Sequence, residues 1–134
     1  MKDKVIIDTS VWINYFQNPP SILSEQVKEI VFYGEVYVPK IIIAELIQGA
    51  HSEKEVSAIQ NFLDAFRIVG EDEDTWFNAG KLSYALKKKG RTVNLTDCYI
   101  AVIAKKQNCA ILTLDKHFKE IEKESGIRLI APCP

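Results

Sequence analysis

The sequence lacks the features that hold small disulfide-bonded or zinc-bound domains together. Its three cysteines, Cys98, Cys109 and Cys133, are odd in number and widely spaced, and no Cys-x-x-Cys or His/Cys ligand pattern occurs. This usage argues against a disulfide framework and a structural metal site. It favours a reducing, cytoplasmic setting.

Long apolar segments are also missing. The apolar segment that follows Met1–Lys4 ends at Asp8, which is too short for a signal peptide. No apolar run approaches the roughly 20 residues that span a bilayer. We therefore expect a cytoplasmic protein that does not insert into a membrane.

The sequence has no excess of basic residues. Its 17 Lys and Arg against 18 Asp and Glu give a net charge of −1. Because tight nonspecific nucleic-acid binding usually shows as a basic excess, the balance argues against such a binder. It leaves open an enzyme that holds a polyanionic substrate through a bound cation.

The remaining composition is that of an ordinary globular protein. The 134 residues, 47% hydrophobic and 26% charged, fit a single domain spanning residues 1–134. A chain of this length buries enough surface to form a core without cross-links.

Short β-branched runs alternate with helical patterns along the whole chain. Strands separated by helices require crossover connections, which predicts an α/β fold with a mainly parallel central sheet and helices on both faces. The helix that Thr96 is expected to cap is apolar from Tyr99 to Ala104 and suits a sheet face. The expected strands are 5–7, 36–38, 66–69, 110–114 and 128–130, and the expected helices are 10–17, 21–32, 39–48, 53–65, 72–89, 96–107 and 116–124.

Four acids occupy positions that such a fold can bring together. Asp8 and Asp115 each follow a predicted strand, and ligands of parallel sheets bind beyond the carboxyl ends of the strands. Asp97 lies in the first turn of its helix. Glu45 is the one charge in the apolar stretch 41–47, so full exposure is not expected.

Each acid alone has an ordinary structural interpretation. Asp8 suits a helix cap, Asp97 a helix-start acid and Asp115 a turn residue, whereas Glu45 is hardest to explain this way. Two charges at about 4 Å repel by about 4 kcal/mol at an effective dielectric near 20, so clustered carboxylates must take up protons or a cation. Oxygen ligands favour Mg²⁺ or Mn²⁺ over zinc, and such a site suits phosphodiester hydrolysis.

Four segments resemble the successive motifs of the PIN-domain family. They are Val5–Val11, Ala44–Gly49, Thr96–Ala104 and Leu112–Phe118, in the family's order and across almost the whole chain. No single motif is specific, but all four together are. The size of the chain is similar to that of the VapC toxins of bacterial and archaeal toxin–antitoxin pairs.

The resemblance implies a PIN fold, Mg²⁺- or Mn²⁺-dependent endoribonuclease activity on RNA, a homodimer and a VapB-like antitoxin that blocks the site. By motif position it implies four catalytic and metal-binding acids and two supporting hydroxyls, which would bond to metal-bound water or to a neighbouring acid. These are Asp8, Glu45, Asp97 and Asp115, with Thr9 and Thr113.

Other functions are less well matched but stay open. A haloacid-dehalogenase phosphatase normally has a second Asp where this sequence has Ser10, and a receiver domain needs an acid pair that is not evident. A noncatalytic PIN-like scaffold or a housekeeping PIN nuclease remain alternatives. The four retained acids weigh against the scaffold, because a dead site has no reason to keep their repulsion.

Three further features have both a functional and a structural interpretation. Lys87–Lys89 with Arg91 suits either an RNA backbone contact or a solvated helix end. The aromatic residues Trp12, Tyr15 and Phe16 suit either stacking on RNA bases or packing. The packing would be in the core, in a dimer interface or against an antitoxin. His117 suits either substrate contact or a surface position at a helix start.

Overall fold

The computed structural model describes residues 2–134, which form one five-stranded sheet and seven helices. All neighbouring strands are parallel, in the order β3-β2-β1-β4-β5. The predicted α/β class and parallel sheet are confirmed. The strands are β1 (Lys4–Ile7), β2 (Glu35–Pro39), β3 (Arg67–Val69), β4 (Ala110–Leu112) and β5 (Arg128–Ile130).

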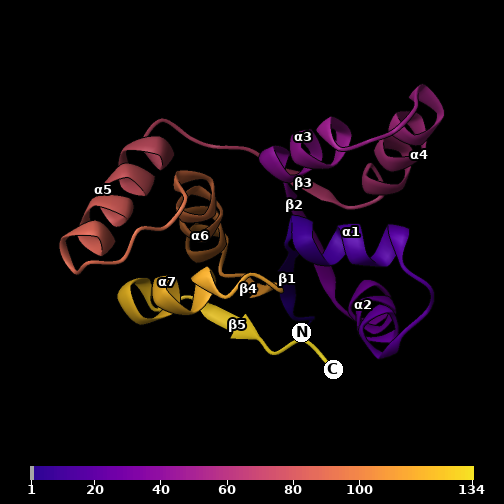
Figure 1. Cartoon of the computed structure of the whole chain (residues 1–134). Helices are drawn as coiled ribbons and strands as arrows, with labels where there is room; N and C mark the ends of the chain where they lie inside the picture. Colours follow the sequence, from indigo (N-terminus) through magenta and orange to yellow (C-terminus); the bar gives the residue numbers. More distant parts are fainter. Residues whose placement is uncertain (1) are drawn as a thin grey trace.

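The helices divide between the two faces of the sheet (Figure 1). From β1 to β3 the chain moves toward one edge of the sheet, and from β3 to β5 it moves toward the other edge. Because crossover connections are right-handed, the first four helices lie on one face of the sheet and the last three on the other. The helices are α1 (Thr9–Gln17), α2 (Ile22–Tyr33), α3 (Lys40–Gln48), α4 (Glu53–Leu63), α5 (Thr75–Lys88), α6 (Leu95–Gln107) and α7 (His117–Ser125).

The chain reverses direction across the sheet between β1 and β4. After β1 it continues to β2 on one side, and after β4 it continues to β5 on the other. The crevice beyond the carboxyl ends of two such strands is where open parallel sheets bind ligands. Any site built from the ends of β1 and β4 is therefore expected at this point.

The core is formed by the strands and the helix faces that cover them. β1 is buried on both faces, with Ile6 and Ile7 fully inaccessible, as the β-branched run predicts. Trp12 is fully buried and packs edge-on against Phe62, so core packing is the role of this aromatic. Cys98 is also fully buried, and burial raises the pKa of its thiol to about 11, which agrees with a packing role. Within residues 2–134, no helix is long and apolar enough to cross a membrane.

Several helix starts differ from the sequence-based expectation. Helix α6 begins at Leu95 because Asn94, not Thr96, is its N-cap: the Asn94 side chain accepts the Thr96 N–H at 2.8 Å. Helix α5 begins at Thr75 rather than Asp72, because Thr75 Oγ1 donates to Asp72 Oδ1 at 2.7 Å and holds the preceding segment in a turn. Helix α2 begins at Ile22, one residue after the expected start, because Ser21 is its N-cap and its side chain accepts the Ser24 N–H.

The strand after α6 is shorter than expected. Pairing of β4 ends at Leu112, because the Thr113 hydroxyl turns toward Asp8 and the Leu114 N–H donates to Ser10 Oγ at 3.1 Å. Residues 113–116 therefore form a loop over the carboxyl end of the sheet, and α7 starts one residue later than predicted.

Two of the basic residues at the end of α5 and just after it have a structural role. Lys89 forms an ion pair with Glu124 at 2.6 Å, and Arg91 forms one with Glu120 at 2.7 Å. Both acids lie on α7, so these two ion pairs hold the end of α5 against α7. Lys87 and Lys88 lie exposed in the last turn of α5, where positive charge favours the helix dipole.

Candidate active site

The carboxylate of Asp8 is fixed at the end of β1 by two hydroxyl groups. Ser10 Oγ and Thr113 Oγ1 donate to Asp8 Oδ2 at 2.9 and 2.8 Å. Asp8 occupies the N-cap position of α1, but its side chain makes no capping hydrogen bond. The interpretation of the Asp8 side chain as a helix cap is therefore wrong. Within residues 2–134 no group donates to Oδ1, which leaves that oxygen of a buried carboxylate without a partner.

The loop after β4 is joined to β1 through the same hydroxyls. The parallel register places Ile7 opposite Leu112, and the Asp8 N–H donates to the Leu112 carbonyl at 2.9 Å. Thr113 Oγ1, which donates to Asp8, also accepts the Asp115 N–H at 3.0 Å. One threonine thus fixes the positions of two acids that are far apart in the sequence.

Asp97 faces Asp115 across this crevice from the first turn of α6. Partial burial raises its pKa to about 7 from an ordinary value of 3.8, and the charges of Asp115 and Asp8 add to the effect. A hydrogen bond with Asp115 and the charge of Glu45 raise it further. The four predicted acids therefore lie close enough to act on one carboxyl group.

Glu45 approaches the same crevice from α3. Thr9 Oγ1 donates to Glu45 Oε1 at 2.9 Å, so this hydroxyl bonds to a neighbouring acid, one of the two alternatives expected for Thr9. Burial raises the pKa of Glu45, the Thr9 hydrogen bond opposes this, and the charge of Asp8 adds to the increase. The side chain is partly buried, as its apolar surroundings predict.

The tightest cluster includes a histidine that was not among the predicted ligands. One ligand atom each from Asp97, Asp115 and His117 lie within 4.8 Å of one another. His117 starts α7 and its side chain is 64% exposed, but Nδ1 lies 3.0 Å from Asp115 Oδ1. Its position two residues after Asp115 was the available signal; the expected helix-start position is confirmed, and contact with substrate stays a prediction.

Ser10 is the second contributor that sequence reasoning missed. It joins Asp8 Oδ2 to the Leu114 N–H and so connects α1 to the loop after β4. The signal was the run Asp8-Thr9-Ser10, in which both hydroxyls follow an acid. Thr9 and Ser10 diverge because consecutive residues at a helix start point in different directions: one bonds to Glu45 and the other to Asp8.

The donor set fits a hard divalent cation. Carboxylate oxygens of Asp97 and Asp115 lie within 4.8 Å of each other, and after burial the charges of Asp115, Asp8 and Glu45 help to raise the pKa of Asp97. A cation with a preference for oxygen ligands relieves exactly that repulsion. Asp8, Asp97 and Asp115 are the residues that would hold it, with Glu45 at the margin of the site.

The raised pKa of Asp97 predicts how stability depends on pH without metal. Because the folded chain keeps a proton on Asp97 up to about pH 7 while the unfolded chain releases it near 3.8, stability is fully present below pH 3.8 and falls as pH rises through 7. We expect Asp97→Asn to raise the free energy of unfolding at pH 8 by about 1–2 kcal/mol, a value reduced for partial solvent screening. At pH 4 the same substitution should have little effect.

Urea unfolding in EDTA at the two pH values measures this difference. If Asp97→Asn changed the free energy of unfolding by the same amount at pH 8 and at pH 4, Asp97 would not be held in an acidic cluster.

Comparison with known proteins defines the class of this fold and site. The family model described as PIN domain matches residues 5–124. The structure of VapBC-1 from nontypeable Haemophilus influenzae is similar over 95% of this chain and 96% of that chain, with a TM-score of 0.77 and 26% identity. The DNA-bound VapBC structure from Salmonella typhimurium shares the fold, with a TM-score of 0.78, 24% identity and coverage of 98% and 99%.

A curated relative places the chain more narrowly. Ribonuclease VapC1 of Methanocaldococcus jannaschii is 30% identical over 128 residues, which cover 96% of this chain and 88% of the relative. Ribonuclease VapC1 of Haemophilus influenzae strain R2866 is 29% identical over 121 residues, with coverage of 87% and 90%. The chain therefore belongs to the PIN-domain family and, within it, to the VapC ribonucleases, which confirms the resemblance seen in the sequence.

Proposed function

We propose that this chain is an endoribonuclease that depends on Mg²⁺ or Mn²⁺ and acts as the toxin of a toxin–antitoxin pair. The observation that carries the proposal is the cluster of Asp97 and Asp115, whose ligand atoms lie within 4.8 Å, beside Asp8 at the point where the sheet reverses its strand order. The names of the relatives supply the substrate class, since they are ribonucleases and one, from Shigella flexneri, is a tRNA(fMet)-specific endonuclease.

The protein's own residues divide into ligands and groups that orient them. Asp8, Asp97 and Asp115 hold the cation, and Glu45 completes the acidic site. When bound there, the cation would supply attraction for phosphate oxygens and a more acidic bound water for phosphodiester hydrolysis. Ser10 and Thr113 donate to Asp8 Oδ2, which would leave Oδ1 to bind the cation.

Glu45 is suited to move a proton. Thr9 donates to Oε1, which leaves Oε2 for another partner, and burial raises the pKa of the group above its ordinary value. We infer that Oε2 accepts a proton from the attacking water. His117, hydrogen-bonded to Asp115, orients that carboxylate from the other side of the crevice.

The proposed partners are a VapB-like antitoxin protein and a second copy of the chain. Several similar structures are VapBC or toxin–antitoxin complexes, including those from Haemophilus influenzae and Klebsiella pneumoniae. A protein that blocks the acidic crevice would suppress the nuclease until it is removed. The homodimer is expected from the family resemblance.

Induced expression in a bacterial host tests the proposal. The wild-type chain should arrest growth and produce discrete RNA fragments, whereas Asp97→Asn at equal expression should do neither, because the cation is no longer held. Co-expression of the adjacent small reading frame should restore growth. Harmless expression of folded wild-type chain, with intact cellular RNA, would instead support a noncatalytic scaffold.

A further inference from the structure

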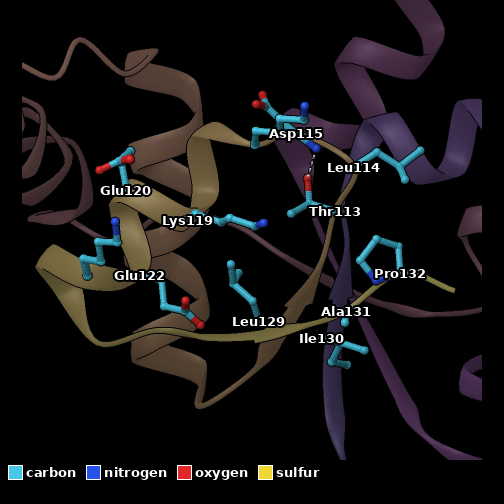
Figure 2. A pocket seen from close by; sticks show the side chains of 12 residues that line it. Thr113, Leu114, Asp115, Lys119, Glu120, Glu122, Leu129, Ile130, Ala131 and Pro132 are labelled. Carbon is cyan, nitrogen blue, oxygen red and sulfur yellow. Dashed lines mark hydrogen bonds between the residues drawn. The ribbon is translucent and has the colours of Figure 1, made fainter. Parts of the chain in front are cut away.

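A cavity opens directly beside the acidic site. It has a volume of about 720 Å³ and lies between the loop after β4, α7, and β5 with the segment that follows it. Thr113 and Asp115, which belong to the candidate active site, also line it. We call it the α7 cavity (Figure 2).

One side of the α7 cavity is basic. Lys116, Lys119 and Lys123 line it at a spacing of three and four residues, which places them along one face of the helix. Within the described part of the chain none of these three lysines forms an ion pair with a carboxylate. Figure 2 shows the Lys119 side chain extending from α7 across the cavity toward Thr113.

The acids that share the lining do not neutralise these lysines. Asp115 is engaged in the acidic site, and Glu120 is paired with Arg91 at 2.7 Å. In Figure 2 the Glu120 side chain points away from Lys119. Glu122 is the remaining acid of the lining, so with Glu120 paired to Arg91 the three lysines stand against two acids, Asp115 and Glu122, in a chain whose net charge is −1.

The opposite side of the α7 cavity is apolar. Leu129 and Ile130 of β5 and Pro132 line it, and Figure 2 shows Leu129 rising toward Lys119. A cavity of this volume holds a ligand of nucleotide size, since small-ligand sites span roughly 300–1,000 Å³. An apolar surface opposite a row of cations suits a base on one side and phosphates on the other.

We propose that the α7 cavity binds the nucleotide that adjoins the phosphodiester cut at the acidic crevice, with Lys116 and Lys119 on its phosphates and Leu129 against its base. The inference rests on the proposed function, because Asp115 belongs both to the acidic site and to the lining of the cavity. The α7 lysines therefore give the chain the local phosphate contacts that its overall charge does not provide.

Binding of a labelled, mixed-sequence single-stranded RNA of about 20 nucleotides, followed by fluorescence anisotropy in Mg²⁺, tests the cavity. An Asp8→Asn background prevents cleavage. We expect Lys116→Ala, Lys119→Ala and Lys123→Ala together to raise Kd by about tenfold and to reduce the slope of log K against log salt by about 1.4, since each of the two lost phosphate contacts to a single strand removes about 0.7.

A matched control removes the same charge elsewhere. Lys81, Lys87 and Lys88 are exposed on α5 and, among residues 2–134, form no ion pair. The triple alanine variant at these positions should change Kd by less than about twofold. A charge-neutral variant, Ala131→Trp, should raise Kd by filling the cavity while leaving the salt slope unchanged.

Cleavage by the otherwise wild-type enzyme gives an independent readout. Lys119→Ala should raise KM several-fold with kcat nearly unchanged, and Lys119→Arg should restore KM. If the α5 and α7 triple variants weakened RNA binding equally, the inference would be overturned. The effect would then come from the overall charge of the protein and not from the α7 cavity. It would also be overturned if the α7 variants left RNA binding intact and weakened only inhibition by a co-expressed antitoxin.

Failure of the inference and failure of the proposed function give different results. A chain that binds RNA through the α7 cavity but never cuts it would contradict the nuclease and support the cavity. A chain that cuts RNA at rates insensitive to all three lysines would support the nuclease and contradict the cavity.

Discussion

Asp8→Asn is expected to lower the rate of RNA cleavage by about 10³-fold and to leave the fold intact. The substitution keeps the shape of the side chain, and its amide oxygen can still accept the hydroxyls of Ser10 and Thr113. It removes one negative charge from the ligand set, and loss of a transition-state interaction of that kind costs rate rather than stability. In metal-free buffer the unfolding free energy should stay the same or rise, because one source of repulsion at Asp97 is gone.

Single-turnover cleavage and urea unfolding, measured on the same preparation, separate the two effects. Asp64→Asn is a suitable control, since Asp64 is an exposed acid at the C-cap of α4. It undergoes the same chemical change away from the crevice and should retain wild-type activity. Wild-type cleavage by Asp8→Asn would remove the role proposed for the acidic cluster.

Removal of divalent cations is expected to have an effect of similar size. With EDTA, cleavage should fall by about 10³-fold, because the acids then repel both each other and the phosphate backbone. Mg²⁺ or Mn²⁺ should restore it. The cation should also raise the Tm, since a ligand at 100 times its Kd stabilises the folded state by about 2.7 kcal/mol.

Asp97→Asn again provides the contrast. Because Asp97 is the carboxyl most affected by its neighbours, its replacement should reduce both the cation-dependent increase in Tm and the recovery of cleavage. Full cleavage by wild-type chain in EDTA, or an identical Tm increase in the variant, would mean that metal acts somewhere other than this crevice.

The sequence predicted the sheet and the meeting of the acids because both follow from local patterns. β-branched runs marked the strands, and the alternation with helices predicted the crossovers that make neighbouring strands parallel. Asp8 and Asp115 follow strand ends, so a parallel arrangement places them at the same edge. The roles of Asp8, Glu45, Asp97 and Asp115 as ligands stay predictions.

The features that sequence did not predict depend on side-chain direction and on contacts between distant segments. Nothing local indicates that Thr113 turns to Asp8 and ends β4, since the apolar pattern of Ala110–Leu114 continues past Leu112. The Asn94 cap was missed because Thr96, two residues later, is also a preferred capping residue by type.

The α7 cavity was also beyond local reasoning. Lys116, Lys119 and Lys123 look like a solvated helix face in the sequence, and only the position of β5 beside α7 gives them an apolar surface opposite. His117 reaches Asp115 because α7 starts immediately after the loop. Such contacts are set by packing, which a single sequence does not reveal.

Diffraction from crystals of the wild-type chain grown with Mn²⁺ tests the central claim most directly, because the anomalous signal locates the ion. The predicted result is a peak at direct coordination distance from the carboxylates of Asp8, Asp97 and Asp115, absent from crystals of Asp97→Asn. Manganese bound only elsewhere, with those three carboxylates uncoordinated, would contradict the account.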